Sequence, residues 1–390
     1  MKDVDNTICE HYNLCGGCSL QDIPYETQLK NKKDKVLKLL SQKGIINFNF
    51  LGIEASPNIF NYRNKMEFSF GYFQGEKKLQ LGMHPRNDPN NVITVDKCEI
   101  IDSDFRKILS TTLEYFRKQG LPPYNVMSRK GYLRHLIVRK GINSGEIIVN
   151  LVTTSQHKNN NSELVKKLNS LNLKDKIIGI LHTINNGFSD AVECDRLITL
   201  YGRDYFIENI LDKRFKIKPF SFFQVNSRSA EKLYKTIIEF LDENNQKIDV
   251  LYDLYCGTGT ISQLVSSQTS QVIGIEIDQD AVITARENAK LNNINNCSFI
   301  CGDVGSKIKR IKENADTIIV NPPRAGLDSK VINYLKLIKA PQLIYSSCNP
   351  ETLARDLHQL TDNLYQLDKV KCIDMFPHTP HIETCTHLSI

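Results

Sequence analysis

The sequence contains no uninterrupted apolar run that approaches the ~20 residues of a transmembrane helix. It also lacks a signal-peptide pattern, because residues 1–5 (MKDVD) are polar and acidic where a secretion signal needs basic and then apolar residues. Internal repeats and low-complexity tracts are absent as well. The first two absences predict a cytoplasmic protein that neither spans a membrane nor is secreted, and we expect it to be a monomer.

The composition is that of a globular protein, with 24% charged and 41% hydrophobic residues. A chain of 390 residues is long enough for two or three domains, each with its own core. The formal net charge of +6 permits a polyanionic partner but does not require one. Eleven cysteines in a chain without a secretion signal indicate metal ligands or catalytic thiols before disulfides.

The pattern along the chain changes near residue 214. The earlier part is mixed, with strands expected at 67–73, 133–138, 146–153 and 177–185 and helices at 21–42, 103–118 and 161–168. The later part alternates strands at 250–255, 272–276, 297–301, 317–320 and 342–346 with helices at 227–243, 261–267, 279–292, 329–337 and 351–360.

Regular alternation of this kind predicts right-handed βαβ units and a parallel sheet. We therefore expect an α/β protein with a mixed domain over residues 1–213 and a regular α/β domain over residues 214–390. The helix at 21–42 is expected to pack on the second domain.

Cys348 follows the last of these strands, and Asn349-Pro350 then opens a helical pattern. Asn is a good helix N-cap and Pro suits the first helical position, so Cys348 should lie where a strand gives way to a helix. Ligands bind at that edge of open α/β sheets, and a helix N-terminus favours the reactive thiolate. The alternative is a buried cysteine that acts as a small hydrophobic side chain.

A glycine-rich turn follows the strand at 250–255, and it predicts a cofactor site. Such a turn lets a cofactor approach the backbone, and an acidic residue at the end of the next strand can hold ribose hydroxyls. The residues concerned are Gly257, Gly259, Thr260, Glu276 and Asp303. The G-x-G-x-x-G spacing of a pyrophosphate cradle is missing. The pattern therefore favours an adenosyl cofactor such as S-adenosylmethionine, which has no pyrophosphate.

Cys348 and Glu383 form a chemically sensible pair for modifying carbon 5 of uracil. A thiolate that adds to C6 makes C5 nucleophilic enough to attack a sulfonium methyl group, and a base must then remove the C5 proton. A solvated surface residue is the alternative interpretation of Glu383.

The segment Asn321-Pro322-Pro323-Arg324 follows the strand at 317–320. In many N-methyltransferases an aromatic residue ends the corresponding segment and stacks on the base. Arg324 occupies that place here, which counts against methylation of an amine. A rigid Pro-Pro turn is the alternative interpretation.

Four cysteines, Cys9, Cys15, Cys18 and Cys98, make a plausible four-thiolate metal site. Iron–sulfur clusters and structural zinc both use four cysteines, and the spacing leaves the two open. Unrelated free cysteines are the third possibility.

Two basic stretches interleave aromatic residues, at 62–65 and 129–140. Cationic side chains beside stacking rings suit single-stranded or looped RNA, although such runs are also common on solvated faces. The candidate RNA contacts are Arg63, Lys65, Arg134 and Arg324.

Together these motifs resemble the RNA uracil-C5 methyltransferase family, whose members make 5-methyluridine, and most closely its cluster-bearing 23S rRNA enzymes. The resemblance covers nearly the whole chain and rests on residues 9–11, 15–18, 62–65, 221–226, 253–259, 321–324, 346–349 and 374–379.

This resemblance implies a class I, Rossmann-like methyltransferase domain that follows a mixed α/β domain carrying a 4Fe–4S cluster. Cys348 would be the nucleophile and Glu383 the proton acceptor. S-adenosylmethionine would be bound by Gln224, Tyr255, Glu276 and Asn321, and the cluster by Cys9, Cys15, Cys18 and Cys98. Asn321 stands where many members have Asp. The small β-barrel domain with which many relatives begin is expected to be missing.

The expected function is methyl transfer from S-adenosylmethionine to C5 of a uridine in RNA. Because the tRNA-acting branch of the family lacks the cysteine cluster, the resemblance favours 23S rRNA. The alternatives are a tRNA uridine-54 C5 methyltransferase, an RNA N-methyltransferase that uses Asn321-Pro322-Pro323, and an inert iron–sulfur RNA-binding protein. Zinc is the alternative to the cluster.

Overall fold

The computed structural model describes residues 9–242, 248–311 and 314–390. The polar start at residues 1–5 and the last residue of the helix expected at 227–243 lie outside them. None of the helices in the described ranges is long and apolar enough to cross a lipid bilayer.

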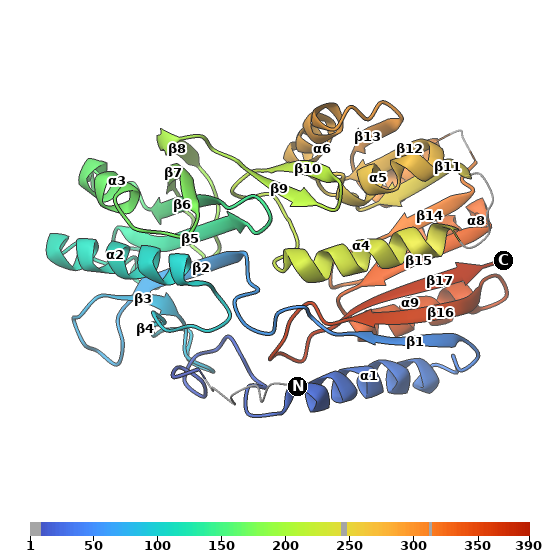
Figure 1. The fold of residues 1–390 in the computed structure, drawn as a ribbon, viewed down its shortest axis with the longest axis horizontal. Coiled ribbons are helices and arrows are strands. Elements are labelled where there is room, and N and C mark those ends of the chain that lie inside the picture. Colours follow the sequence, from blue (N-terminus) through green and yellow to red (C-terminus); the bar gives the residue numbers. More distant parts are fainter. Residues whose placement is uncertain (1–8, 243–247, 312–313) are drawn as a thin grey trace. The chain divides into compact units, whose positions relative to one another are not determined.

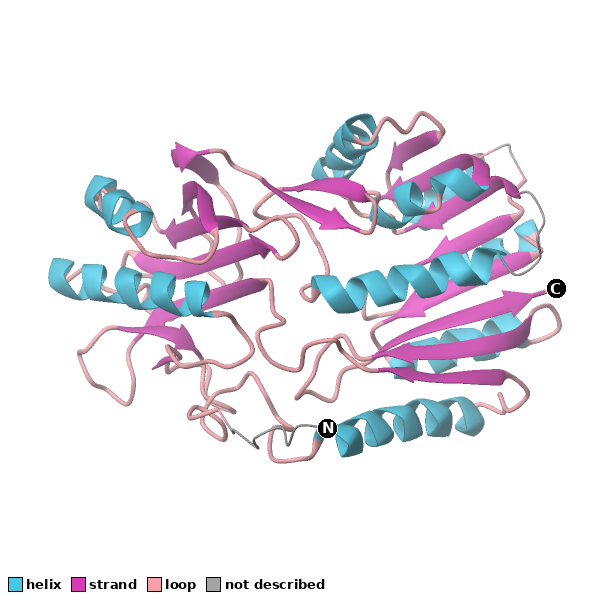
Figure 2. Ribbon diagram, in the orientation of Figure 1, coloured by secondary structure: helices cyan, strands magenta, loops and turns pink. Residues whose placement is uncertain are grey.

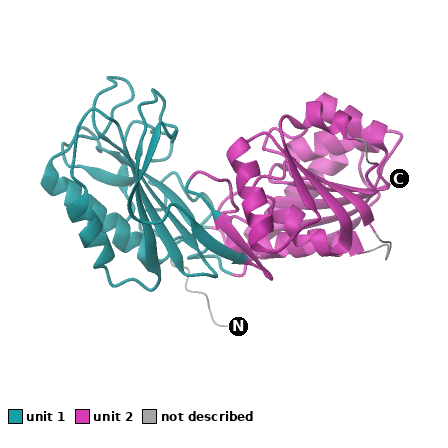
Figure 3. Ribbon diagram, turned by 90° about the horizontal axis from the view of Figure 1, so that it is seen from above, with its two compact units in different colours: residues 1–22, 58–209, 217–219 teal, residues 23–57, 210–216, 220–390 magenta. Residues whose placement is uncertain are grey.

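The chain forms two compact units (Figure 3). Unit 1 contains residues 1–22, 58–209 and 217–219. Unit 2 contains residues 23–57, 210–216 and 220–390. The early segment 23–57, which includes the expected helix at 21–42, thus belongs to the same unit as the regular α/β region.

Unit 2 is built around an eight-stranded sheet with the order β1-β16-β17-β15-β14-β11-β12-β13 (Figures 1 and 2). These strands are β1 (Asn49–Glu54), β11 (Ile248–Leu254), β12 (Thr269–Glu276), β13 (Cys297–Cys301), β14 (Thr317–Val320), β15 (Gln342–Ser347), β16 (Gln366–Ile373) and β17 (Glu383–Ser389). The five strands from β11 to β15 are parallel to one another, as expected from the βαβ pattern, whereas β17 is antiparallel to both β15 and β16.

Helices cover both faces of this sheet. They are α1 (Tyr25–Gln42), α4 (Ser227–Asp242), α5 (Thr260–Leu264), α6 (Gln279–Leu291), α7 (Val304–Lys307), α8 (Ser329–Ile338) and α9 (Pro350–Thr361). Apolar residues of α1, α7, α8 and α9 share one core with the sheet, among them Val36 and Leu357. In Figure 1, α4 lies across the near face of the sheet and α9 lies behind it. The unit therefore has the three-layer, Rossmann-like arrangement that the sequence predicts.

Unit 1 contains a seven-stranded mixed sheet with the order β4-β3-β2-β5-β6-β7-β8. Its strands are β2 (Lys65–Gly71), β3 (Gln80–Met83), β4 (Ile93–Thr94), β5 (Leu133–Gly141), β6 (Glu146–Thr153), β7 (Lys176–Ile184) and β8 (Arg196–Gly202), and its helices are α2 (Ser103–Gln119) and α3 (Ser162–Asn169). Apolar residues of α2, α3 and the sheet form one core. A separate two-stranded sheet of β9 (Phe206–Ile210) and β10 (Lys213–Ile217) lies where the chain passes between the units.

The expected helices and strands are all present, some with different bounds, and the structure adds strands that were not predicted, among them β1, β3, β8 and β16. Helix α1 begins at Tyr25 and not at residue 21, because Pro24 is its N-cap and its extended backbone does not continue a helix. The helix expected at 261–267 is the short α5, followed by a 3₁₀ turn at Ser266–Gln268.

Candidate active site

The candidate site lies at one edge of the unit 2 sheet, where the five parallel strands end. These strands finish at Leu254, Glu276, Cys301, Val320 and Ser347. Their register aligns the ends, since Leu254 pairs with both Ile275 and Val320, and Val320 pairs with Tyr345. The segments that follow these strands contain most of the predicted cofactor and catalytic residues, as the general rule for ligand sites in open α/β sheets requires.

Cys348 lies between the end of β15 and the start of α9, where the sequence places it. The Asn349 side chain accepts a hydrogen bond from the amide of Glu351 (3.1 Å) and caps the helix, and Pro350 occupies its first turn. The Asn349 amide donates to the Ser347 hydroxyl (3.1 Å). These contacts fix the backbone on both sides of the thiol.

Glu383 begins β17 at the same edge of the sheet. It pairs with Ile373 of β16, and the next residue, Thr384, pairs with Ser347 of β15, so Glu383 lies beside the strand end that leads to Cys348. Its side chain is buried, and its Oε2 has no hydrogen-bond partner among the described residues. Burial raises the pKa of the Glu383 carboxyl to about 8, although the charge of Arg324 acts in the opposite direction.

Arg324 connects these two groups. Its side chain hydrogen-bonds the Cys348 thiol, and its charge favours the ionised forms of both Cys348 and Glu383. Its backbone carbonyl accepts hydrogen bonds from the side-chain amide Nδ2 of Asn349 (3.0 Å) and the Thr352 hydroxyl (3.2 Å), which hold it against the start of α9. Arg324 thus brings a positive charge to the thiol and the carboxyl together.

Asp356 of α9 fixes the segment that carries Arg324. Its carboxylate accepts hydrogen bonds from the Leu327 amide (2.8 Å) and the Tyr345 hydroxyl (2.7 Å), and its side chain is fully buried. Gly326 packs so closely here that a Cβ atom would lie 2.5 Å from an Asp356 oxygen. Asp356 is not among the residues predicted from the sequence. The available signal was an acidic residue on the apolar face of the helix expected at 351–360.

The pKa of the Cys348 thiol corrects one expectation. The helix N-terminus led us to expect a thiol that ionises easily, but burial raises its pKa and the negative charge of Glu383 raises it further. Arg324 opposes both effects through its charge and its hydrogen bond. The effect of the helix N-terminus on the thiol pKa can be predicted from local sequence. The effects of burial and of Glu383, which is distant in sequence, cannot.

The turn after β11 has a backbone conformation that lets a ligand approach the main chain closely. Tyr255, Gly257 and Gly259 all have left-handed backbones, with φ of 63°, 54° and 73°. A Cβ atom at Gly257 would meet no heavy atom within 4 Å, whereas one at Gly259 would lie 2.8 Å from the ring of Phe299. The backbone of Gly257 therefore borders open space, and Gly259 allows close packing of the turn.

Acidic side chains surround this turn. One oxygen of the Glu276 carboxylate accepts from the Gly257 amide (3.0 Å), and the other accepts from the amides of Ile277 (2.8 Å) and Asp278 (2.9 Å). Asp303 caps α7 by accepting from the Ser306 amide (2.9 Å). Burial raises the pKa of the Tyr255 hydroxyl, and Asp303 and Glu276 are among the charges that raise it further.

The other predicted cofactor residues also belong to unit 2. The Asn321 amide donates to the Leu254 carbonyl (3.3 Å), which places Asn321 beside the turn. Thr260 begins α5 directly after Gly259, and Gln224 is buried ahead of α4.

The four predicted cluster cysteines all lie in unit 1. Each of the six pairs among Cys9, Cys15, Cys18 and Cys98 interacts electrostatically. Burial raises the pKa of Cys18 to about 11 and that of Cys98 to about 12. Within the described ranges, however, no three of these sulfur atoms lie within 4.8 Å of one another. The thiols are therefore neighbours that are not gathered around one small ion.

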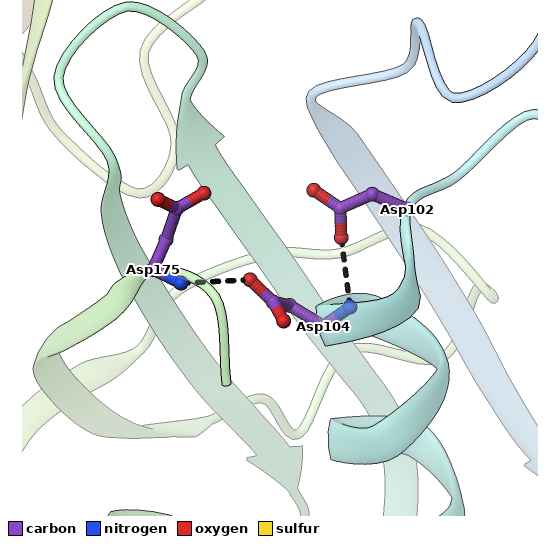
Figure 4. A group of neighbouring side chains, drawn as sticks. All are labelled: Asp102, Asp104 and Asp175. Atoms are coloured by element: carbon purple, nitrogen blue, oxygen red, sulfur yellow. Dashed lines mark hydrogen bonds between the residues drawn. The ribbon is translucent and has the colours of Figure 1, made fainter. Parts of the chain in front are cut away.

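A different group in unit 1 does bring three potential ligands that close together, namely Asp102, Asp104 and Asp175 (Figure 4). Lys140 forms ion pairs with all three carboxylates. The amide of Asp175 donates to Asp104 (3.1 Å), and Asp102 caps α2. Since a buried ammonium group already supplies the compensating charge, we interpret this group as structural.

The predicted RNA contacts differ in their surroundings. The Arg63 guanidinium donates to the Lys65 carbonyl (2.9 Å), and the Lys65 ammonium pairs with Glu67 (2.7 Å). Arg134 is only 3% exposed, and its guanidinium donates to three backbone carbonyls in the loop at 185–189. A direct contact between Arg134 and RNA would require those bonds to break.

Comparisons with known proteins agree with this geometry. The family model described as tRNA (Uracil-5-)-methyltransferase matches residues 24–390. A protein of Clostridium tetani named "Uncharacterized RNA methyltransferase" is 50% identical over 380 residues, which cover 97% of this chain and 83% of that protein. A protein of the same name from Leptospira interrogans is 35% identical over 395 residues, which cover 98% of this chain and 98% of that protein.

A solved structure shows the same likeness across both units. The tRNA (uracil-54, C5)-methyltransferase of Pyrococcus abyssi, in complex with S-adenosyl-L-homocysteine, is 27% identical with a TM-score of 0.76. The match covers 96% of this chain and 86% of that one. The fold and the site thus define a Rossmann-like methyltransferase. The chain belongs to the tRNA (uracil-5-)-methyltransferase family, which confirms the family resemblance and the enzyme class expected from the sequence.

Proposed function

We propose that this enzyme transfers a methyl group from S-adenosylmethionine to C5 of a uridine in RNA through a covalent adduct with Cys348. The arrangement of Cys348, Glu383 and Arg324 at adjoining strand ends carries the proposal. A nucleophile, a buried carboxyl and a cation meet there, at the sheet edge that also bears the open turn at Gly257.

The residues at the turn fit an adenosyl cofactor. We propose that S-adenosylmethionine is held by Gln224, Tyr255, Gly257, Gly259, Thr260, Glu276, Asp303 and Asn321. The open space beside Gly257 and the acidic side chains of Glu276 and Asp303 support this assignment. The bound cofactor would supply an electrophilic methyl group on a positively charged sulfur.

The protein's own groups would perform the rest of the chemistry. The Cys348 thiolate adds to C6 of uracil, which makes C5 a carbon nucleophile that forms a bond to the methyl carbon as the sulfonium bond breaks. The Glu383 carboxylate then takes the C5 proton. The electron pair of that C–H bond forms the C5–C6 double bond, and the C6–S bond breaks to return the thiolate. Arg324 stabilises the thiolate before addition and after release.

We also propose that Cys9, Cys15, Cys18 and Cys98 hold a 4Fe–4S cluster. A single zinc ion bound through Zn–S bonds of about 2.3 Å needs sulfur atoms roughly 4 Å apart. The four thiols interact electrostatically, but no three of their described sulfur atoms lie within 4.8 Å of one another. This wider spacing suits a 4Fe–4S core better than a single zinc ion.

The RNA class is the finer part of the proposal. The cysteine motif favours 23S rRNA, as the family resemblance implies. A tRNA uridine is the second candidate, since the family description and the Pyrococcus abyssi enzyme both name tRNA. We propose Arg63, Lys65 and Arg324 as direct RNA contacts. Arg134, which is buried, would instead hold the loop at 185–189. The proposed substrate is a cytoplasmic RNA.

The decisive experiment incubates the purified protein with labelled S-adenosylmethionine and, separately, with 23S rRNA and tRNA that carry no 5-methyluridine. Mass spectrometry of the nucleosides should find 5-methyluridine in one of the two RNAs. A methyl group on an exocyclic amine would overturn the C5 proposal in favour of an N-methyltransferase. No measurable cofactor binding by calorimetry would overturn the proposal in favour of an inert RNA-binding protein.

A further inference from the structure

The loop that leads to Glu383 is held by side chains from outside the strands that it connects. This segment, residues 374–382, joins β16 to β17, and its ends are tied by the pairing of Ile373 with Glu383. Any movement of the loop therefore acts directly on the residue that we propose as the base.

Three consecutive carbonyl groups at the start of the loop each accept a hydrogen bond from a side chain of α1, of α4 or of Asn226, the residue directly before α4. The Asp374 carbonyl accepts from the Ser229 hydroxyl (3.0 Å), and the Met375 carbonyl accepts from the side-chain amide Nδ2 of Asn226 (3.1 Å). The Phe376 carbonyl accepts from the ammonium group of Lys32 in α1 (3.0 Å). The backbone of this loop is thus fixed from two directions, by the start of α4 and by α1.

Lys32 makes a second, ionic contact with the same loop. Its ammonium group lies 2.6 Å from the Asp374 carboxylate, and the two side chains are 2% and 0% exposed. The other Asp374 oxygen accepts from the Tyr25 hydroxyl (2.8 Å), which in turn accepts from the Ser56 amide (2.9 Å). A charged pair this deeply buried persists only when its geometry is tightly specified.

A third residue of α1 reaches further along the loop. Gln28 is buried, and its side-chain oxygen accepts from the backbone amide of His378 (2.9 Å). Tyr25, Gln28 and Lys32 are spaced three and four residues apart, so they lie on one face of the helix. Gln28 and Lys32 on this face are buried and Tyr25 is half-buried. All three side chains bind residues of the 374–382 loop.

We propose that Lys32, supported by Tyr25, is a positioning residue that holds the 374–382 loop so that Glu383 stays aligned with the proton it removes. This inference rests on the function proposed above. It assigns to a helix near the start of the chain a role in the release step, in which the C5 proton leaves and the C6–S bond breaks. Lys32 is not expected to touch the RNA base, the cofactor or the thiol.

The inference predicts an unequal effect on the two chemical steps. Addition and methyl transfer use Cys348, which α9 and the 321–327 segment position, so a loosened 374–382 loop should change them little. Proton removal depends on Glu383, and a misplaced base is expected to slow that step by roughly tenfold to 100-fold. The covalent protein–RNA adduct should therefore accumulate.

The test compares wild type, Lys32→Gln, Tyr25→Phe, Glu383→Gln and the control Lys30→Gln on the RNA that the wild type methylates. Single-turnover methyl transfer and the fraction of protein in denaturant-stable RNA adduct are measured for each. Lys32→Gln, and to a smaller extent Tyr25→Phe, should raise the adduct fraction toward that of Glu383→Gln. Lys30→Gln should behave as wild type, because Lys30 is exposed and its ammonium group pairs with Asp34 on the same helix.

Two results would overturn the inference while leaving the proposed function intact. One is an adduct fraction equal to that of the wild type in folded Lys32→Gln or Tyr25→Phe. The other is an equal decrease in the rates of methyl transfer and of adduct release, which indicates a merely structural contact. Should Lys32→Gln fail to fold, judged by circular dichroism, the milder Tyr25→Phe decides alone. Failure of the wild type to form 5-methyluridine would overturn the proposed function itself.

Discussion

Glu383 and Cys348 lie at the ends of neighbouring antiparallel strands, and the charge of the carboxyl raises the pKa of the thiol. The two groups therefore oppose each other's ionisation, and Glu383 is buried while Cys348 is half-buried. Arg324 is the cation that favours both ionised forms. A site with this charge arrangement makes definite predictions for single substitutions.

Replacement of the thiol should separate binding from chemistry. Cys348→Ala is expected to lose methyl transfer by ~10³-fold or more, because covalent addition no longer activates C5. Cofactor affinity, measured by calorimetry, should stay near that of the wild type. Cys194→Ala is the matched control, since Cys194 is an exposed thiol of unit 1. Full activity of Cys348→Ala would contradict the covalent mechanism.

Replacement of the carboxyl should stop the reaction after methyl transfer. Glu383→Gln keeps the shape of the side chain but is no base, so the adduct should persist in denaturing gels with the methyl group already attached. Normal turnover without a detectable adduct would assign the base to another residue. The adduct should be absent from the double variant Cys348→Ala/Glu383→Gln, which controls for nonspecific crosslinking.

The rate of adduct release should rise with pH toward about pH 8. Glu383 acts as its carboxylate, and burial raises the pKa of this group to about 8, so fewer molecules have the active form at lower pH. The raised pKa of Cys348 favours addition at higher pH in the same sense. The measurement is single-turnover kinetics between pH 6 and 9, and a release rate that is flat across this range would contradict the assignment.

Stability should show the opposite pH dependence. The folded-state pKa of Glu383 is raised from 4.5 to about 8, so its contribution to stability is full below pH 4.5 and is lost as pH rises toward 8. Glu383→Gln avoids the cost of a buried charge. It should be the more stable protein at pH 9, by several kcal/mol with about 5 as the upper limit, and should gain little at pH 4. Denaturant titrations at the two pH values test the difference.

Two glycines of the cofactor turn should respond differently to the same substitution. Gly257→Ala places a methyl group in open space, so it should lower cofactor affinity by about tenfold while costing only ~1 kcal/mol of backbone strain. Gly259→Ala meets the Phe299 ring and should add roughly 1–3 kcal/mol of overpacking to the same strain. Calorimetry with S-adenosylhomocysteine and thermal unfolding measure the two effects. Equal losses of affinity and stability in both variants would refute the open site.

The cysteine site predicts a metal content. Protein purified without oxygen should show broad visible absorption and about four iron atoms per chain if the 4Fe–4S assignment is correct. Cys98→Ser should reduce the iron content, whereas the same change at Cys194 should not. One zinc atom per chain and a colourless protein would favour the zinc alternative.

The sequence predicts the strand and helix order of residues 227–361 well, because these elements have clear periods and strong boundary signals. Asn349-Pro350 marks the start of α9, and the glycines mark the turn after β11. Spacing also indicates that Glu276 ends its strand and that Cys348 follows its own. These predictions depend on local patterns, which a single sequence contains in full.

What the sequence does not reveal depends on pairings between distant segments. β1 is a short strand with mostly half-buried residues, and nothing local indicates that it pairs with β16 more than 300 residues later. The raised pKa values of Cys348 and Glu383 likewise depend on burial and on Arg324. Lys32 looks like one of several surface lysines until its partner Asp374 is placed beside it.

The parallel pairing of β1 with β16 also constrains how the protein forms during synthesis. Segment 23–57 leaves the ribosome more than 300 residues before β16, which is its neighbour in the sheet. The apolar residues of β1 and α1 stay without their partners until the intervening residues have been synthesised. Closing the long loop between β1 and β16 is slow and entropically costly. Nascent chains stalled before residue 366 should thus expose β1 without its partner strand and the apolar face of α1 without its full core. Both are suitable targets for a chaperone.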